Sequence, residues 1–274
     1  MPVKRNPLKA GLARGTVQVG TWVNMIRTPV VLTLLKSAGL DYARIDMEHS
    51  PPSMETIADM AALARALDFP ILVRPPSGDR EWVTRLLDAG VWGLHIPQVD
   101  TPEIARAVVA AALYAPAGLR GMAGIGPHND FTPGASLAEL NEQVHLTVML
   151  ESPRAFENLD EIVATPGVDA VTLGPSDLAQ ELGVLGKPEQ ASVIDGYRQR
   201  MIDSALRHGK DVAMLCDTPR QAARWVAAGV RIIVLSSEVA VLHDAYSSMS
   251  AELRSAIAQP NLSLSSRASR FLPM

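Results

Sequence analysis

The chain has 274 residues, of which 47% are hydrophobic, and its formal net charge is −4. This length and apolar fraction suit one large α/β domain, and the absence of a basic stripe argues against a nucleic-acid-binding protein. No stretch of about 18 apolar residues occurs, so we expect no membrane span. Residues 1–15 show no secretory pattern, and Cys216 is the single cysteine. We therefore expect a cytoplasmic protein.

A helix–glycine–strand pattern recurs along the chain. In each case a helical stretch ends at a glycine, and a short apolar segment follows that ends in polar residues. Such repeated units predict a parallel sheet. Eight strands are predicted, at Thr16–Val23, Tyr42–Asp46, Ile71–Arg74, Gly93–Pro97, Leu146–Leu150, Ala170–Leu173, Val212–Leu215 and Ile232–Leu235.

Helical patterns lie between these strands. Residues 54–67 are rich in Ala and carry apolar residues at three- and four-residue spacing. Strands that alternate with helices in this number predict an α/β fold of the (β/α)8 barrel type. A doubly wound open sheet is the alternative, but it usually has fewer strands and a glycine-rich first turn, and no such turn follows the first strand here.

Two segments depart from the alternation. Residues 114–134 form a long stretch rich in Gly and Pro between the fourth and fifth strands, and loops of this length are often functional. The end of the chain is rich in Ser and shows no helical period. We expect one barrel domain over residues 1–257 and a flexible tail over residues 258–274.

Two carboxylates follow neighbouring strands of the predicted barrel. Glu151 comes directly after the fifth strand, and Asp177 lies shortly after the sixth. Active sites of such barrels lie at the C-terminal ends of the strands, and neighbouring strands are about 5 Å apart. A divalent cation such as Mg²⁺, which takes one or two carboxylates, would offset the repulsion between the two side chains. The alternative is that each carboxylate caps the helix that follows it.

The second and third strands end in further polar residues. His49 follows Asp46 and Glu48, and His is the default proton carrier near neutral pH. Either carboxylate would orient its ring, whereas a loop His without a catalytic role would bond only to backbone. Arg74 ends a buried strand, where its charge needs Asp46, Glu48, an anionic substrate or an enolate as a partner.

Several other kinds of site are not supported. No Lys terminates a predicted strand, which argues against a Schiff-base mechanism. The sequence has no G-x-S-x-G, C-x-x-C or H-E-x-x-H motif. His95 lies within the fourth strand, where an interior His with satisfied hydrogen bonds is expected and a role at the rim is the alternative.

Five motifs, taken in order and spacing, resemble the HpcH/HpaI aldolase family of metal-dependent pyruvate aldolases. The resemblance runs from about Gly20 to Ala256. The motifs are Asp46-Met47-Glu48-His49-Ser50-Pro51, Val73-Arg74-Pro75, Ala115-Pro116-Ala117-Gly118-Leu119-Arg120-Gly121, Leu150-Glu151-Ser152 and Leu173-Gly174-Pro175-Ser176-Asp177-Leu178.

The resemblance implies a set of roles for the residues at the strand ends. It implies a divalent metal (Mg²⁺, Mn²⁺ or Co²⁺) held by Glu151 and Asp177. It also implies acid–base catalysis by His49 with support from Asp46, and enolate stabilisation by Arg74. The substrate-binding residues implied are Gly174, Pro175, Ser176, Trp22 and Arg120. The family further implies a homohexamer, a trimer of dimers, in which the last helix packs on a neighbouring subunit.

The activity implied is the reversible cleavage of 4-hydroxy-2-oxo acids to pyruvate, or a close 2-oxo acid, and an aldehyde. The alternatives are a CoA-ester lyase, a decarboxylating enzyme that forms carbon–carbon bonds, and a barrel without catalytic activity. The expected partners are these small molecules and other copies of the chain. Met149 stands where relatives often have Gln, His95 stands at a usually aliphatic position, and the loop 122–133 differs, so the aldehyde is not predicted.

Overall fold

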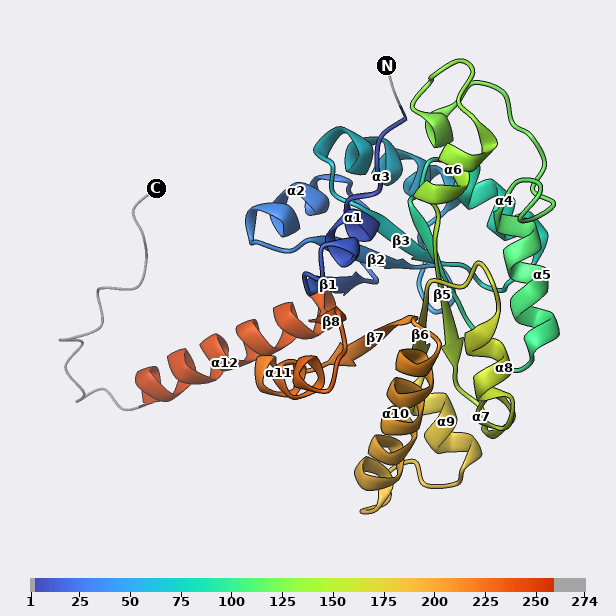
Figure 1. Cartoon of the computed structure of the whole chain (residues 1–274). Coiled ribbons are helices and arrows are strands. Elements are labelled where there is room, and N and C mark those ends of the chain that lie inside the picture. Colours follow the sequence, from blue (N-terminus) through green and yellow to red (C-terminus); the bar gives the residue numbers. More distant parts are fainter. Residues whose placement is uncertain (1–2, 259–274) are drawn as a thin grey trace. The chain divides into compact units, whose positions relative to one another are not determined.

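The computed structural model describes residues 3–258 of the chain. Within this part, eight parallel strands close into a barrel in which each strand pairs with the next and β8 pairs with β1 (Figure 1). The predicted (β/α)8 architecture is therefore confirmed. The strands are β1 (Gln18–Val23), β2 (Tyr42–Asp46), β3 (Ile71–Arg74), β4 (Gly93–Ile96), β5 (His145–Leu150), β6 (Ala170–Leu173), β7 (Asp211–Cys216) and β8 (Ile232–Ser237).

The helices that lie between β1 and β8 in the chain surround the barrel and connect its strands (Figure 1). The Thr101 hydroxyl caps the helix that follows β4 by accepting from the backbone N–H of Ile104, and Pro102 occupies the first helical position. The helices are α1 (Pro7–Ala13), α2 (Val30–Ser37), α3 (Met54–Leu67), α4 (Arg80–Asp88), α5 (Pro102–Ala112), the 3₁₀ turn η1 (Pro127–Asn129), α6 (Leu137–Gln143), α7 (Pro153–Glu157), α8 (Leu159–Ala164), α9 (Pro175–Glu181), α10 (Gln190–Arg207), α11 (Pro219–Ala227) and α12 (Glu238–Ala258).

The predicted strand boundaries agree with the structure to within about two residues. Strands β2, β3 and β6 match at both ends. Strand β1 starts at Gln18 rather than Thr16, because its pairing with β8 begins there. Strand β4 ends at Ile96, since Pro97 has no backbone N–H to continue the ladder.

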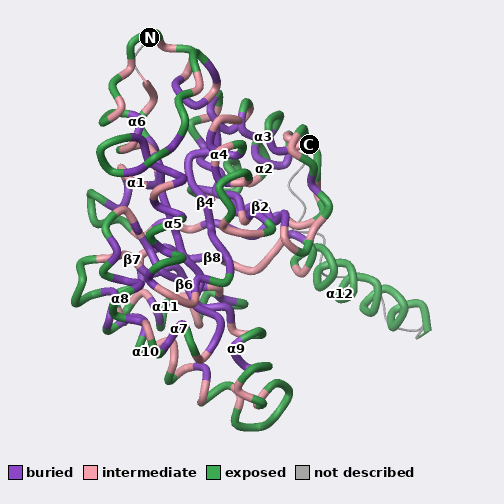
Figure 2. Tube along the Cα trace, turned by 90° about the vertical axis from the view of Figure 1, so that its right-hand side faces the viewer, coloured by how far each residue is buried: buried purple, intermediate pink, exposed green. Residues whose placement is uncertain are grey.

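Apolar side chains fill two layers. The larger cluster lies between the strands and the surrounding helices, and in Figure 2 the labelled strands are coloured mostly as buried. A second cluster fills the barrel interior, where Leu8 and Leu12 of α1 pack with Tyr42 and Leu72. Helix α1 thus belongs to the inner core. Its N-cap Asn6 donates hydrogen bonds to the carbonyls of Trp92 and Gln143, which precede β4 and β5.

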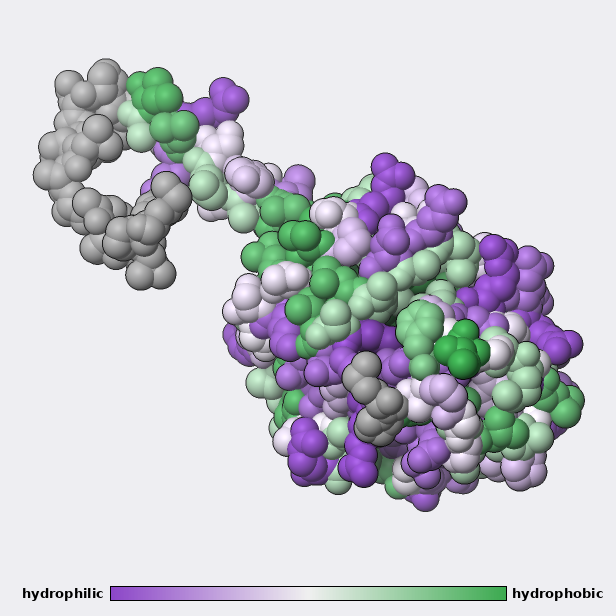
Figure 3. Space-filling model, turned by 90° about the horizontal axis from the view of Figure 1, so that it is seen from above, coloured by the Kyte–Doolittle hydropathy of each residue, from purple (hydrophilic) through white to green (hydrophobic). Residues whose placement is uncertain are grey.

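The chain divides into two compact units, Met1–Glu238 and Val239–Met274. The described part of the second unit is the rest of α12, which is exposed over most of its length in Figure 2. Hydrophobic residues recur along this helix in Figure 3. Its exposed apolar side chains are Val239, Val241, Leu242, Tyr246, Met249, Leu253 and Ile257. The predicted tail, apart from residue 258 at the end of α12, lies outside the described residues.

None of the helices among residues 3–258 is both long enough and apolar enough to cross a membrane.

Candidate active site

An ion-pair network joins the ends of β2 and β3. Asp46 and Arg74 are paired in the sheet register, and the Nε of Arg74 donates to Asp46 Oδ1 over 2.8 Å. The Nη1 of Arg74 lies 3.1 Å from Glu48 Oε2. Asp46 is buried, and its hydrogen bonds with Arg74, the Glu48 N–H and the Ser50 hydroxyl lower its pKa against the effect of burial. Both acids that the sequence offered as partners for Arg74 therefore hold it.

His49 stands at the edge of this network. Its side chain is 65% exposed, and its Nε2 lies 3.6 Å from Glu48 Oε2. Asp46 accepts a hydrogen bond from the backbone N–H of His49 over 3.3 Å rather than from its ring. The carboxylate that faces the imidazole is thus Glu48, while Asp46 fixes the loop that carries the His.

Glu151 is a buried carboxylate at the end of β5. Its Oε1 accepts a hydrogen bond of 2.7 Å from the backbone N–H of Gln98, whose φ of 54° lies in the left-handed region that is unfavourable for residues other than Gly. Burial, together with the negative charges of Asp177 and Glu48, raises the pKa of Glu151 to about 7. The Gln98 N–H and Arg74 act in the opposite direction.

The turn between β6 and α9 provides the space that Glu151 occupies. A Cβ atom on Gly174 would stand 2.3 Å from Glu151 Oε2 and 2.7 Å from Glu151 Cβ. Pro175 begins α9, and no side chain caps this helix. The backbone N–H groups of its first turn, including those of Ser176 and Asp177, therefore lack intrahelical acceptors.

Trp22 lies beside Arg74 in the barrel. The guanidinium carbon of Arg74 lies 4.8 Å from the centroid of the Trp22 ring. Arg44, paired with Trp22 in the register of β1 and β2, lies 5.8 Å from the same ring. The ring of His95 meets Trp22 edge-on at 5.3 Å, and its Nδ1 lies 2.5 Å from Arg44 Nη1.

The Arg44–His95 pair is wholly buried and carries atoms without partners. Burial and the two neighbouring Arg charges keep the pKa of His95 well below its usual value, so its neutral ring accepts from Arg44. Among the described residues, Arg44 Nε, Arg44 Nη2 and His95 Nε2 have no hydrogen-bond partner. His95 is therefore an interior residue, as predicted, but only one of its two ring nitrogens has a hydrogen-bond partner among the described residues.

Arg120 is the one predicted substrate-binding residue that the structure places apart from the others. Its Nη2 lies 2.6 Å from Asp88 Oδ1 on α4, and its guanidinium stacks on the Tyr114 ring at 4.7 Å. It is buried, and these contacts attach the loop after α5 to α4. The structure brings together the other predicted residues at the ends of β1, β2, β3, β5 and β6.

Sequence reasoning missed two residues that support this site. Ser50 belongs to the motif at residues 46–51, but the sequence predicted no role for it. Its hydroxyl donates a hydrogen bond to Asp46 Oδ2 over 3.0 Å. Arg44 was not considered, although strand alternation places it on the same face of β2 as Tyr42 and Asp46. The alternation of side chains along β2 could therefore have indicated that Arg44 points into the barrel.

A family model described as HpcH/HpaI aldolase/citrate lyase matches residues 18–245. The chain belongs to this family. A 5-keto-4-deoxy-D-glucarate aldolase of Shigella boydii serotype 18 (strain CDC 3083-94 / BS512) is 34% identical over 247 residues, which cover 89% of this chain and 95% of the relative. The predicted family is confirmed, and with it the prediction of an enzyme of the carbon–carbon lyase class.

Solved structures show the same relationship. The HpcH/HpaI aldolase from Desulfitobacterium hafniense DCB-2 aligns with a TM-score of 0.86 and 30% identity, covering 95% of this chain and 99% of that one. The citrate synthase SbnG aligns with a TM-score of 0.82 and 25% identity, covering 94% and 100%. The family's barrel thus extends over nearly the whole chain.

The residues at the rim fit a hard divalent cation. Glu48, Glu151 and Asp177 act on one another electrostatically, since Asp177 raises the pKa of both glutamates. Carboxylate oxygens are the ligands that Mg²⁺ and Mn²⁺ prefer. Among the described residues, no group of three or more His, Cys, Asp or Glu side chains is arranged to hold a metal. Two protein carboxylates would therefore leave the other coordination positions to water and substrate.

Proposed function

We propose that this protein is a divalent-metal-dependent aldolase that cleaves a 4-hydroxy-2-oxo acid to pyruvate, or a close 2-oxo acid, and an aldehyde, and that it catalyses the reverse addition. The observation that carries the proposal is the grouping of Glu151, Asp177 and Glu48 beside Arg74 and His49 at one end of the barrel. Membership of the HpcH/HpaI family supports the same chemistry.

Glu151 and Asp177 would hold the cation, with Mg²⁺, Mn²⁺ or Co²⁺ as the candidates. When bound, a divalent cation polarises the keto group of a 2-oxo acid and makes its C3 protons more acidic. The buried position of Glu151 keeps its charge in a medium of low dielectric, where its interaction with a cation is strong.

His49 is the residue that moves a proton at C3 of the keto acid. Its exposed ring reaches a substrate above the barrel, and Glu48 stabilises the imidazolium that forms when the ring accepts the proton. The same ring returns the proton in the reverse direction.

Arg74 orients and stabilises the enolate that proton removal creates. Its Nε and Nη1 face Asp46 and Glu48, and Nη2 takes part in neither ion pair. This leaves a fixed donor for the oxygen on which negative charge develops, an arrangement that stabilises transition states without reorganisation. Trp22 supports the guanidinium from the barrel side.

The substrate carboxylate would meet the turn Gly174, Pro175 and Ser176. Donors from the uncapped first turn of α9 suit a carboxylate group. For the substrate, we propose a hydroxylated sugar-derived 2-oxo acid of the kind named for the Shigella boydii relative. Arg120 is not included among the proposed substrate-binding residues, because its ion pair with Asp88 at the end of α4 holds it away from the C-terminal ends of the strands. We further propose that the protein acts in the cytoplasm as a homo-oligomer.

The proposal is tested by a coupled assay for pyruvate release from 5-keto-4-deoxy-D-glucarate with Mg²⁺ or Mn²⁺. We expect cleavage by the wild-type protein and a decrease in kcat of roughly 10²–10⁴-fold for His49→Ala, the usual scale of acid–base contributions. The matched control is His208→Ala at the end of α10, which should keep wild-type activity. Full activity of His49→Ala would remove this residue from the mechanism.

Incubation of the protein with oxaloacetate and an acyl-CoA, alongside the pyruvate-release assay, separates the alternatives. Citrate or CoA-ester formation from oxaloacetate and an acyl-CoA, without aldol cleavage, would indicate the lyase or synthase chemistry of other family members. Absence of both activities with every metal tested would favour a barrel without catalytic activity.

A further inference from the structure

The turn between β4 and α5 holds a conformation that its sequence does not favour. Gln98 has a φ of 54°, in the left-handed region that residues other than Gly, Asn and Asp rarely adopt. The residue is exposed, so burial of its side chain does not hold the backbone there. Strained backbone of this kind persists only where neighbouring contacts fix it, and it is most common at functional sites. The contacts of residues 98–100 therefore indicate what the turn does.

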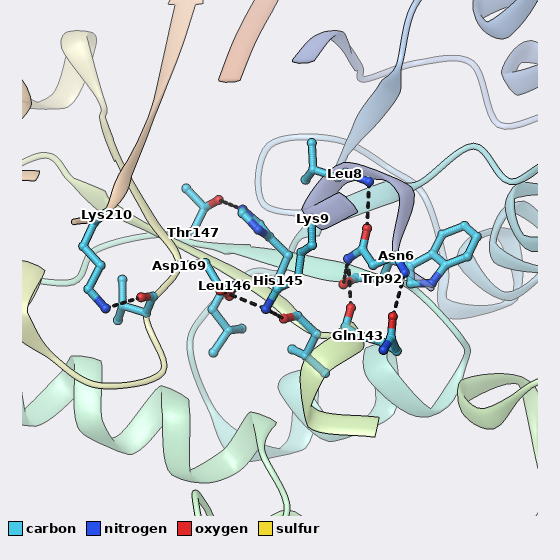
Figure 4. A network of polar contacts seen from close by, with 12 residues as sticks. Asn6, Leu8, Lys9, Trp92, Gln143, His145, Leu146, Thr147, Asp169 and Lys210 are labelled. Atoms are coloured by element: carbon cyan, nitrogen blue, oxygen red, sulfur yellow. Dashed lines mark hydrogen bonds and ion pairs between the residues drawn. The ribbon is translucent and has the colours of Figure 1, made fainter. Parts of the chain in front are cut away.

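Strand β5, which Glu151 directly follows, is held at both ends. At its start, Asp169 Oδ2 accepts from the backbone N–H of Leu146 over 2.8 Å (Figure 4). At its end, the backbone N–H of Val99 donates to the Met149 carbonyl over 3.1 Å. The backbone of the strand is therefore fixed up to two residues before Glu151.

The carboxylate of Glu151 is itself held by the same turn. The backbone N–H of Gln98 donates to its Oε1 over 2.7 Å. On the other side, a Cβ atom on Gly174 would stand 2.3 Å from its Oε2, so this oxygen packs against the turn after β6. One oxygen thus has a fixed backbone donor and the other has a close neighbour, which restricts the directions in which the carboxylate can point.

The side chain of Asp100 holds the residue that follows Glu151. Its Oδ1 accepts from the Ser152 hydroxyl over 2.5 Å. The same Ser152 oxygen accepts from the backbone N–H of Ala155 and so caps α7, and the Asp100 carbonyl accepts from the Asn158 side chain over 3.0 Å. Because Ser152 is buried, its bond to Asp100 is sheltered from competing water.

We propose that Asp100 is a positioning residue, which fixes the Glu151 carboxylate through Ser152 and through the backbone N–H of Gln98. Asp100 joins the turn to the chain on the far side of Glu151, and this connection keeps the Gln98 N–H directed at the carboxylate. Partners that orient a metal ligand typically contribute about 10–100-fold to metal affinity. The inference rests on the proposed function, in which Glu151 holds the cation.

The first test is isothermal titration of the full chain with Mn²⁺ alone, a readout that does not require turnover. Asp100→Ala removes the acceptor of the Ser152 hydroxyl and should weaken Mn²⁺ binding about 10–100-fold. Asp100→Asn keeps an acceptor oxygen at the same place and should bind Mn²⁺ nearly as tightly as the wild type. Gln98→Gly keeps the N–H and permits the same φ, so it should also retain binding.

The matched control is Asp217→Ala. Asp217 comes directly before the N-cap of α11, as Asp100 comes directly before the N-cap of α5, but it is exposed. Its replacement removes an equal charge from the same end of the barrel, and Mn²⁺ binding should match the wild type. The comparison separates the effect of the hydrogen bond from that of the charge.

The second test needs neither metal nor turnover. By NMR in D₂O, the Gln98 amide should exchange slowly in the metal-free wild type. In Asp100→Ala it should exchange roughly tenfold faster, the scale of one lost hydrogen bond. If the wild type binds no Mn²⁺, the proposed metal site fails, and this amide alone decides the role of Asp100. The wild-type amide also decides it if the alanine variant does not fold.

Three results would each overturn the inference. The first is wild-type Mn²⁺ affinity in Asp100→Ala. The second is an equal loss of affinity in Asp100→Asn and Asp100→Ala, because the charge would then be responsible. The third is fast exchange of the Gln98 amide in the wild type, since the turn would then not hold Glu151.

Discussion

At the residue scale, the rim of the barrel is governed by how each buried charge is compensated. Arg74 is paired with Asp46 and Glu48 and rests on Trp22. Glu151 receives one backbone N–H and lies near two other negative charges, so it is the least compensated group. This contrast explains why the pKa of Glu151 rises to about 7 in the protein without a cation.

The metal-free protein should therefore lose stability as the pH rises. The Glu151 carboxyl ionises near pH 4.5 when unfolded and near pH 7 when folded, so the folded state holds an extra proton between these values. The free energy of unfolding therefore decreases by up to about 3 kcal/mol as the pH rises through this window, and it reaches its lower value above pH 7. Chemical denaturation from pH 4.5 to 8 measures it.

Two controls accompany that measurement. Glu151→Gln removes the titrating group and should flatten this part of the pH dependence. Saturating Mg²⁺ should flatten it in the wild type as well, because a cation favours the ionised carboxylate. An equally steep dependence in Glu151→Gln would show that another group is responsible.

The Arg44–His95 pair in the barrel interior predicts a non-additive pair of substitutions. His95→Leu leaves Arg44 without its acceptor and should lower the free energy of unfolding by about 2 kcal/mol or more. Arg44→Leu combined with His95→Leu should return stability to the wild-type value or above, because a buried charge is replaced by apolar packing. A double variant no more stable than His95→Leu, measured by urea denaturation, would contradict this account.

At the scale of elements, the sequence pattern predicted the strands and the rim but not the barrel interior. Glycine breaks and apolar runs located all eight strands within residues 3–258, since buried parallel strands have a distinct composition. The sequence placed His49, Arg74 and Glu151 at one end of the barrel because each ends a strand or closely follows one and all strands run in the same direction. Contacts across the barrel, such as Arg44 with His95 or Glu151 over Gly174, depend on register and shear, which the local sequence does not encode.

The turn between β6 and α9 gives a sharp test of such a contact. A methyl group on Gly174 would overlap the Glu151 carboxylate, although the φ of −87° at this position suits any residue. We expect Gly174→Ala to displace Glu151 and to weaken metal binding and kcat by roughly tenfold or more, the scale of displaced catalytic groups. Metal titration and the pyruvate-release assay measure both effects.

The matched control is Gly196→Ala in α10, where nothing lies within 4 Å of the added methyl group. This substitution should leave metal binding unchanged and stabilise the helix by about 0.5–1 kcal/mol. Wild-type metal affinity in Gly174→Ala would mean that Glu151 has space that the structure does not show.

At the scale of the whole molecule, α12 carries more exposed apolar side chains than a solvated helix needs. The resemblance to the family predicts a homohexamer in which this helix packs on a neighbouring subunit. Replacing Leu242 and Leu253 by Glu should therefore lower the molar mass in solution, as measured by analytical ultracentrifugation, with the secondary structure unchanged. Replacing Ser247 and Ser250 by Glu, on the same helix, tests the effect of charge alone, and an unchanged mass in the Leu variant would contradict the prediction.

The central claim is that His49 removes a C3 proton from a 2-oxo acid bound beside Glu151 and Asp177, which would hold a divalent cation that makes this proton more acidic. Its most direct test is deuterium exchange at the methyl group of pyruvate in D₂O, followed by NMR, because no aldehyde is needed. The account predicts rapid exchange with Mg²⁺ or Mn²⁺, and loss of exchange in EDTA, in Glu151→Gln and in His49→Ala. Undiminished exchange by the protein in EDTA would contradict it.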